Sequence, residues 1–86
     1  QREKDWFNFA MTQQNLAIAY RGIGDYGKSQ IYFERVRDLA TKNNFGELET
    51  MSLQGLSSLF QVRGDHKQAV EILQKVVGQT SAASVR

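Results

Sequence analysis

Residues 15–26 read NLAIAYRGIGDY, and residues 55–66 read GLSSLFQVRGDH. The same order of small, large and turn-forming residues therefore occurs twice in this 86-residue chain, 40 positions apart. The positions that match across this shift include Met11 and Met51, Gln14 and Gln54, Leu16 and Leu56, Tyr20 and Phe60, Gly24-Asp25 and Gly64-Asp65, and Val36 and Val76. A fixed period in which each residue keeps its type indicates a repeat architecture.

Turn-forming residues divide the chain into four segments of helical length. Proline is absent, so the turns depend on glycine, asparagine and aspartate, which gather at 22–27, 43–46 and 64–65 and at Gly78. Between the turns, apolar residues recur at helical spacing. The sequence therefore predicts an all-α fold of two tandem helix–turn–helix hairpins, followed by a linker or flexible tail at 79–86. The expected helices cover about residues 4–21, 26–42, 47–62 and 66–77.

The residue types fit the same structural tasks in both hairpins. Gly24 and Gly64 can end the first helix in the left-handed conformation, which is cheap only for glycine. The aspartate that follows each glycine can then cap the second helix. Small residues let the two helices of a hairpin approach closely, and these are Ala17 and Ser29, then Ser57 and Ala69. The large residues expected in the core are Leu16, Tyr20, Phe33, Val36, Leu53, Leu56, Phe60, Leu73 and Val76.

The repeated residues resemble the tetratricopeptide repeat. The residues that carry the resemblance are Asn15 to Tyr20, Gly24 to Tyr26, Phe33 and Val36, then Leu56, Phe60, Gly64-Asp65, Ala69-Val70 and Val76. It covers about residues 7–78 with a long period of 40, whereas the family's common repeat has about 34 residues. The resemblance implies a short right-handed α-solenoid in one domain over 1–86, with repeat one at about 7–43 and repeat two at about 47–78. Two features depart from the family pattern: Gly55 stands where asparagine is common, and no proline follows the second helix.

Composition argues against several classes of function. Without cysteine and with one histidine, His66, the chain offers no metal-ligand cluster and no catalytic triad. Its 11 basic and 9 acidic residues are interspersed, so no basic block can follow a phosphate backbone. No apolar run approaches the ~20 residues of a membrane span. We therefore expect a cytoplasmic protein that is not an enzyme and that uses no cofactor, metal, nucleic acid or membrane.

One segment imitates a nucleotide-binding loop. Residues 22–29, GIGDYGKS, satisfy the phosphate-binding expression G-x-x-x-x-G-K-[ST]. Such a loop joins a strand to a helix in a parallel sheet, and the chain has no other strand candidates. The equivalent residues 63–69, RGDHKQA, keep the turn and lose the phosphate chemistry. Nucleotide binding through this segment is therefore a remote alternative, and Ser29 is expected to face the helix crossing instead.

The resemblance implies that the first helix of each hairpin lines a concave face. The residues left for that face, outside the expected core, are Gln14, Ile18, Arg21, Gln54, Ser58 and Gln61. Glutamine can hydrogen-bond a peptide backbone, Ile18 can take an apolar anchor and Arg21 can hold a carboxylate. We therefore predict a protein-interaction scaffold that binds a peptide or a partner helix in this groove. The alternative is a structural segment of a longer array, in which these side chains are merely solvated.

Aromatic residues are dense before the first repeat, at Trp6, Phe7 and Phe9. We expect these rings to cover the open end of the core, or to contact a partner or a second copy, and not to stack on nucleic acid. About three repeats are usually needed for a stable array. Two copies in a chain that begins at Gln1 therefore suggest either neighbouring repeats in a longer chain or a homo-oligomer.

Overall fold

The computed structural model describes the backbone of residues 3–85 and the side chains of residues 4–78. Over this range four helices follow one another without any strand: α1 (Glu3–Gly22), α2 (Tyr26–Lys42), α3 (Gly46–Val62) and α4 (His66–Val85). The predicted all-α fold of two hairpins is confirmed. The bounds of α1, α2 and α3 lie within one residue of those expected from the sequence.

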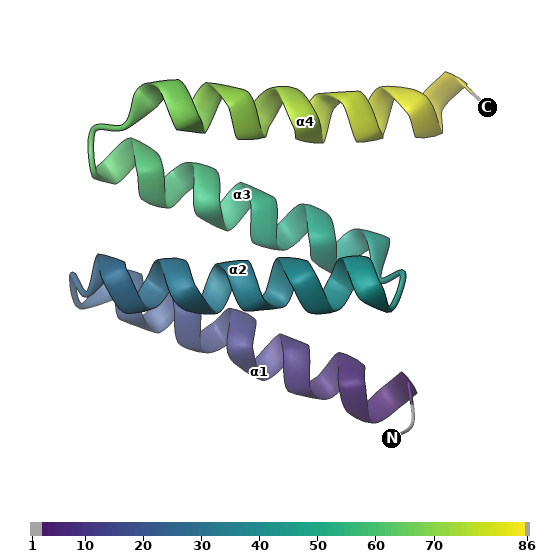
Figure 1. Cartoon of the computed structure of the whole chain (residues 1–86), viewed down its shortest axis with the longest axis horizontal. Helices are drawn as coiled ribbons and strands as arrows, with labels where there is room; N and C mark the ends of the chain where they lie inside the picture. The colour runs from purple at the N-terminus through teal and green to yellow at the C-terminus, as the bar shows by residue number, and fades with distance from the viewer. Residues whose placement is uncertain (1–2, 86) are drawn as a thin grey trace.

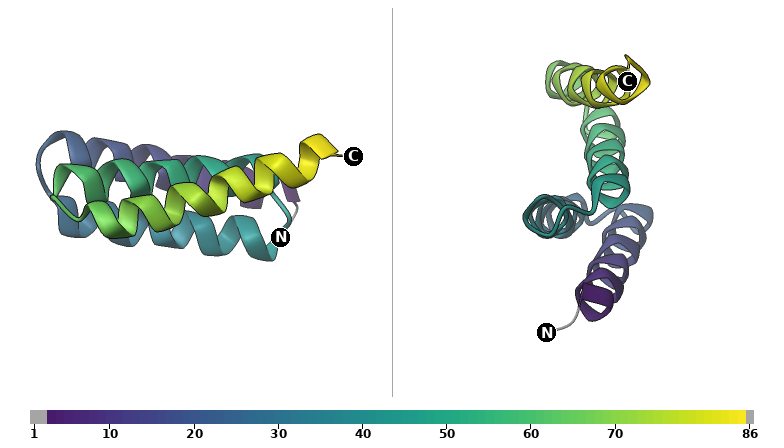
Figure 2. Two further views of the ribbon diagram at one scale, coloured as in Figure 1. Left: turned by 90° about the horizontal axis from the view of Figure 1, so that it is seen from above. Right: turned by 90° about the vertical axis from the view of Figure 1, so that its right-hand side faces the viewer.

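The helices stack in chain order into a flat slab that measures 34 × 33 × 15 Å (Figure 1). Each helix packs against the next one, α1 and α3 touch lightly, and α2 and α4 do not touch over the described residues. Seen end-on, α2 lies to one side of α1 and α3 (Figure 2). The first helices of the two hairpins are therefore neighbours on one face of the slab.

The turns inside the two hairpins have the same geometry. Gly24 and Gly64 have φ angles of 87° and 84°, in the left-handed region that glycine adopts without strain. The amide of Asp25 then donates to the Tyr20 carbonyl at 2.9 Å, and the amide of Asp65 donates to the Phe60 carbonyl at 2.8 Å. These bonds close each first helix in a Schellman-type cap. The expected role of both glycines is confirmed.

Both aspartates also begin the second helix of their hairpin. The Asp25 carboxylate accepts the Lys28 amide at 3.2 Å, and the Asp65 carboxylate accepts the Gln68 amide at 3.3 Å. Each aspartate thus satisfies an amide that has no partner inside the helix. The connection between the hairpins repeats the reversal with Asn44, whose φ is 59°. Asparagine is among the few residues other than glycine that tolerate this conformation.

The core lies where the helices cross. Ala17 and Ser29 are fully buried in the first hairpin, and Ser57 and Ala69 are buried in the second. The predicted position of these small residues at the helix crossings is confirmed. The Ser29 hydroxyl donates to the Ala17 carbonyl at 2.7 Å, so a direct hydrogen bond ties α2 to α1. One buried cluster surrounds this crossing and reaches into the second hairpin: Ala17, Phe33, Leu56, Leu59, Phe60 and Ala69. A second cluster, formed by Ala10, Val36, Ala40 and Leu48, joins the other ends of α1, α2 and α3.

Three expectations differ from the structure. The sequence predicts Leu16 and Leu73 in the core, but both are more than one third exposed because they lie on the outermost helices, α1 and α4. Tyr20 is only half-buried and stacks on Tyr32, with ring centroids 5.5 Å apart.

The expected end of the fourth helix, at about residue 77, is wrong, because α4 continues through Val85. Whether residues 79–86 serve as a linker stays a prediction. Gly78 does not have a positive φ, and a glycine inside a helix costs only about 1 kcal/mol relative to alanine. No proline follows to stop the helix. Arg86 lies outside the described residues.

Candidate partner-binding groove between α1 and α3

Two adjoining hollows lie between α1 and α3, and Met51 lines both of them. The larger, of about 360 Å³, is lined by Gln14, Ile18, Arg21, Phe33, Met51, Gln54, Gly55 and Ser58. The smaller, of about 300 Å³, is lined by Phe7, Met11, Glu47, Leu48 and Met51. We refer to these residues together as the α1–α3 groove.

The α1 side of the groove is a single helical stripe. Its residues are numbers 7, 11, 14, 18 and 21, so they recur every three or four positions and lie on one face of the helix. Fourteen residue steps at ~1.5 Å each give the stripe a length of roughly 21 Å. The groove is therefore long enough to hold several residues of a bound chain.

A phenylalanine from α2 forms the floor of the larger hollow. The Phe33 ring packs directly on Gly55 of α3, because a Cβ atom at position 55 would come within 2.6 Å of ring atom Cζ and 2.8 Å of Cδ1. Position 55 must therefore remain without a side chain, which accounts for its departure from the family pattern. The Arg21 guanidinium lies 5.9 Å from the centre of the same ring, within the range of a cation–π contact.

The charged groups of the groove lie near its two ends. Arg21 is the one charged residue that lines the larger hollow, and among the described side chains it forms no ion pair. Glu47 lines the smaller hollow near the opposite end and is exposed. Between them lie Ile18 and the two methionines, Met11 and Met51. The groove thus joins an apolar middle to a positive end and a negative end.

Five of the six residues predicted for the concave face line this groove together: Gln14, Ile18, Arg21, Gln54 and Ser58. Gln61 lies outside it, is exposed, and donates from its side-chain amide to the Ser57 hydroxyl at 3.3 Å. Whether the five residues bind a partner stays a prediction.

Gln14 differs from the predicted free side chain, because it is only 3% exposed. Its amide nitrogen donates to the Met51 carbonyl at 3.3 Å, so the side chain bridges α1 and α3 at the base of the groove. Its amide oxygen is buried and has no hydrogen-bond partner among the described residues. Gln14 therefore connects the walls of the groove and is poorly placed to receive a ligand from solvent.

The sequence prediction missed Phe7, Met11, Glu47 and Met51 as groove residues. Met11 and Met51 match across the 40-residue shift, and such a match does not distinguish a core residue from a groove residue. The helical spacing that selects Gln14, Ile18 and Arg21 extends back to Met11 and Phe7, and this signal could have identified both.

The aromatic residues near the N-terminus do not form one patch. Phe7 faces the groove and packs edge-on against Phe45, with ring centroids 5.4 Å apart. Trp6 instead meets Phe9 edge-on at 6.2 Å, and Phe9 lines a hollow between α1 and α2. Two residues along a helix correspond to a turn of about 200°, so neighbours at this spacing point to opposite sides. Phe7 and Phe9 therefore face different hollows, and whether the three rings cover the end of the core or contact a partner stays a prediction.

The segment that imitates a phosphate-binding loop is the turn between α1 and α2. Ser29, which would bind a metal ion in such a loop, is fully buried and donates its hydroxyl to the Ala17 carbonyl. The Lys28 ammonium lies 3.9 Å from the Asp25 carboxylate and 5.4 Å from the centre of the Tyr20 ring. A helix, not a strand, precedes the segment. Its residues therefore serve the helical turn.

Other candidate sites are also placed by the structure. His66 is exposed in the first turn of α4. Among the described residues, no three histidine or acidic side chains gather as potential metal ligands. None of the helices in the same range combines the length and hydropathy of a membrane span.

Two tandem helical hairpins, with a groove between their first helices, define a helical-repeat protein of the solenoid type. The model of the tetratricopeptide repeat family matches residues 8–79, and the chain belongs to this family. No curated protein and no solved structure matched the chain. Tetratricopeptide repeats generally mediate protein–protein interactions.

Proposed function

We propose that this protein is an interaction scaffold whose α1–α3 groove binds a peptide or a helix of a partner protein. The observation that carries the proposal is Arg21, which lies over the Phe33 ring at the edge of an apolar hollow and has no ion-pair partner among the described side chains. An acidic side chain of a ligand can pair with this guanidinium. An apolar neighbour of that acidic residue can then enter the hollow beside Ile18 and Met51.

The dimensions and charges of the groove describe the ligand further. A length of roughly 21 Å holds about 14 residues of helix or about six residues of extended chain. The acidic end of the ligand would lie at Arg21, and a basic end would lie at Glu47. Methionine side chains adapt to varied apolar shapes, so Met11 and Met51 support the binding of more than one apolar sequence.

Peptide selection tests this proposal without a known partner. Random 15-residue peptides displayed on phage would be selected against the whole chain, and the enriched peptides would be measured by calorimetry. We expect them to share an acidic residue beside an apolar one. Arg21→Glu is expected to weaken their binding by about tenfold or more, because a favourable charge contact becomes repulsive.

The matched control is Arg35→Glu, which makes the same charge change outside the groove. Arg35 also lies over an aromatic ring, 5.4 Å from the centre of Tyr32, but it is exposed on α2. Binding by this variant should stay within about twofold of the unchanged chain. Peptides that bind Arg21→Glu and Met51→Lys as tightly as the unchanged chain would refute the groove as the binding site. A selection that enriches no peptide would favour the alternative of a structural segment.

A further inference from the structure

The outermost helices, α1 and α4, expose apolar side chains. These side chains lie on the faces that correspond, under the 40-residue shift, to the contact between α3 and α2. On α4 these are Val70, Leu73 and Val77, which line a shallow hollow with Gln74. On α1 they are Phe9, Leu16 and Ile23, spaced seven residues apart. We propose that a second copy of this chain stacks on the first head-to-tail, with α4 of one copy against α1 of the next.

The internal repeat identifies the packing that such a contact would copy. Under the 40-residue shift, α4 corresponds to α2 and α1 corresponds to α3. Inside the chain, α2 packs directly against α3. Each α2–α3 contact therefore predicts a contact between α4 of one copy and α1 of the next.

A polar pair lies at one end of the internal interface between α2 and α3. A guanidinium nitrogen of Arg63, Nη1, donates to the side-chain oxygen of Gln30 at 2.9 Å. The shift replaces these residues by Ile23 and Val70, which are 77% and 52% exposed. Where the covered interface has a hydrogen bond at its edge, the free ends have two apolar side chains in water. Stacking would bring these two side chains together and remove both from water.

The centre of the interface shows a matching exchange of side-chain volume. Inside the chain the large Phe33 packs on Gly55, which leaves no room for a Cβ atom. The equivalent pair is the smaller Leu73 and Asn15, which does carry a side chain. The loss of volume on α4 is thus matched by a gain of volume on α1. This exchange is what two faces that fit each other would require.

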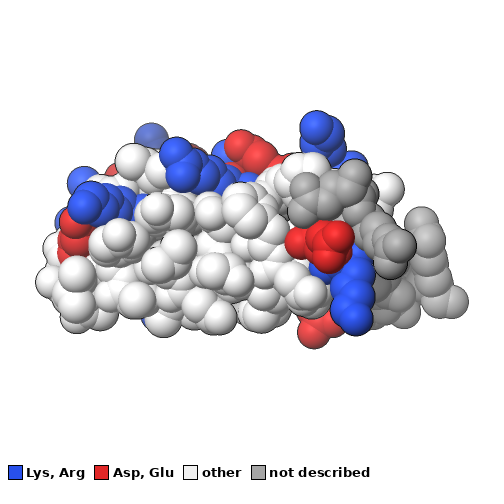
Figure 3. Space-filling model, turned by 90° about the horizontal axis from the view of Figure 1, so that it is seen from below, with Lys and Arg blue, Asp and Glu red and all other residues white. Residues whose placement is uncertain are grey.

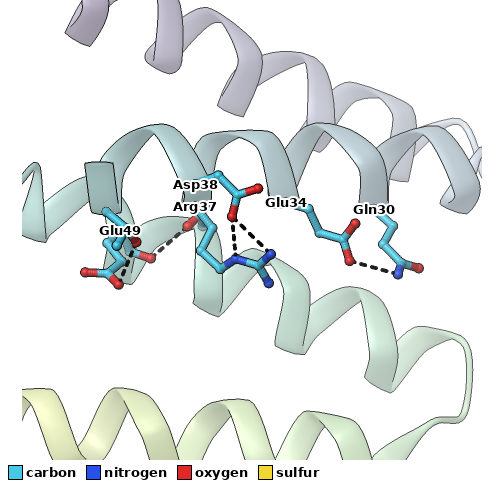
Figure 4. Close-up of polar contacts among 7 residues, drawn as sticks. Gln30, Glu34, Arg37, Asp38 and Glu49 are labelled. Atoms are coloured by element: carbon cyan, nitrogen blue, oxygen red, sulfur yellow. Dashed lines mark hydrogen bonds and ion pairs between the residues drawn. The ribbon is translucent and has the colours of Figure 1, made fainter. Parts of the chain in front are cut away.

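The edges of the internal interface are also more polar than the free ends. Glu49 accepts a hydrogen bond from the Thr41 hydroxyl at 3.0 Å, and Arg37 pairs with Asp38 at 3.2 Å (Figure 4). The shift replaces Glu49 by Phe9 and Arg37 by Val77, both exposed. The α1 side of the molecule is accordingly almost free of charged side chains across its middle (Figure 3). Exposed apolar side chains on a face with few charges are typical of a surface that meets another protein.

A second copy can cover the exposed faces of both α1 and α4. One chain carries both halves of the interface, on α1 and on α4, so a copy supplies the missing half at each end. A symmetric pairing of α4 with α4 would leave Phe9, Leu16 and Ile23 of α1 in water. Head-to-tail contacts do not close on themselves unless their rotation completes a ring, so assembly would continue beyond a dimer.

Two exposed lysine substitutions, Ile23→Lys and Val70→Lys, test the proposal, with mass measured by sedimentation equilibrium over a wide range of concentration. The unchanged chain is expected to form species larger than a dimer as its concentration rises. Each variant alone is expected to associate about tenfold or more weakly, because the interface would bury an unpaired charge. An equimolar mixture should form a 1:1 dimer with the affinity of the unchanged interface, since Val70 of the first variant still meets Ile23 of the second. The two free faces of this dimer, α1 of the first variant and α4 of the second, both carry the new lysine. Further growth would bring these lysines together, so assembly stops at the dimer.

The matched control is Ile31→Lys, which alters another exposed apolar residue, on α2. Because α2 and α4 do not touch over the described residues, the repeat predicts no contact between Ile31 and a neighbouring α4, and association should be unchanged. Circular dichroism would confirm that every variant is folded. A monomer at all concentrations would overturn the proposal. Loss of association in Val70→Lys but not in Ile23→Lys would also overturn it, because that result would indicate α4–α4 pairing. A mixture of the two variants that does not recover the dimer would overturn it as well.

Discussion

The helices α1 and α3 occupy equivalent places in the repeat, yet they differ greatly in burial. Seven residues of α3 are buried, whereas Ala10, Gln14 and Ala17 are the buried side chains described for α1. The reason is position in the stack, because α3 lies between α2 and α4 while α1 packs mainly on α2. Leu56 is consequently buried and its counterpart Leu16 is partly exposed. The same residue pattern therefore forms core in the middle of the stack and surface at its ends.

The largest test of this comparison is alanine substitution at two equivalent positions, Phe33 and Leu73. Phe33→Ala is expected to cost about 3–5 kcal/mol of unfolding free energy, because it removes a fully buried ring from the cluster that joins both hairpins. Leu73→Ala should cost about 1 kcal/mol or less, since that side chain is already partly in water. Urea denaturation at one low protein concentration measures both. Equal losses would show that burial in the stack does not set the difference.

Glycine substitutions sharpen the comparison at the α2–α3 contact. Gly55→Ala should destabilise the protein by about 1–3 kcal/mol, because its Cβ would overlap the buried Phe33 ring. Gly22→Ala adds the same atom at a helical position with no neighbour within 4 Å. That variant should be neutral or more stable by up to about 1 kcal/mol. Thermal unfolding should show a lower midpoint for Gly55→Ala and an unchanged or higher midpoint for Gly22→Ala. Equal decreases in both midpoints would contradict the packing of Phe33 on Gly55.

The two turns offer a comparison in which no difference is expected. Gly24→Ala and Gly64→Ala each force a Cβ into the left-handed region, which costs about 1–2 kcal/mol. The φ angles of 87° and 84° and the shared hydrogen-bond pattern predict nearly equal losses. Urea titration of both variants measures this equality. A loss at one turn alone would mean that the other turn can rearrange.

The smallest changes in unfolding free energy are expected at the helix crossings. The serine lies on the second helix of the first hairpin but on the first helix of the second hairpin. The Ser29 hydroxyl of α2 donates across to the Ala17 carbonyl, whereas Ser57 of α3 accepts from Gln61 within its own helix. Ser29→Ala should therefore cost about 1 kcal/mol. Ser57→Ala should change the unfolding free energy by about 0.5 kcal/mol or less, because alanine also favours the helix. Urea denaturation measures the loss of unfolding free energy in both variants. A larger loss for Ser57→Ala than for Ser29→Ala would contradict these roles of the two hydroxyls.

Much of the fold could be predicted because its signals are local. The left-handed glycines, the aspartate caps and the small residues at the crossings each depend on neighbours within a few positions or on the helix joined by the same turn. Five of the six predicted groove residues also lie together. Helical spacing places three of them on one face of α1 and two on one face of α3, and the repeat sets the first helices of the two hairpins side by side. The end of α4 was harder to predict. A glycine such as Gly78 can either end a helix or lie within one, and the residue alone does not distinguish the two.

The order of helices, their turns and their inward faces follow from residue chemistry that repeats every 40 positions. Which of those faces are covered was decided by the stack, because α1 and α4 each lack a neighbour that α2 and α3 have. The stack also brought Phe33 onto Gly55, withdrew Gln14 from solvent and separated Phe7 from Phe9. These outcomes depend on contacts between residues distant in the chain. Spacing along one helix defines a face, but only the neighbouring helices determine whether that face becomes core, groove or exposed surface.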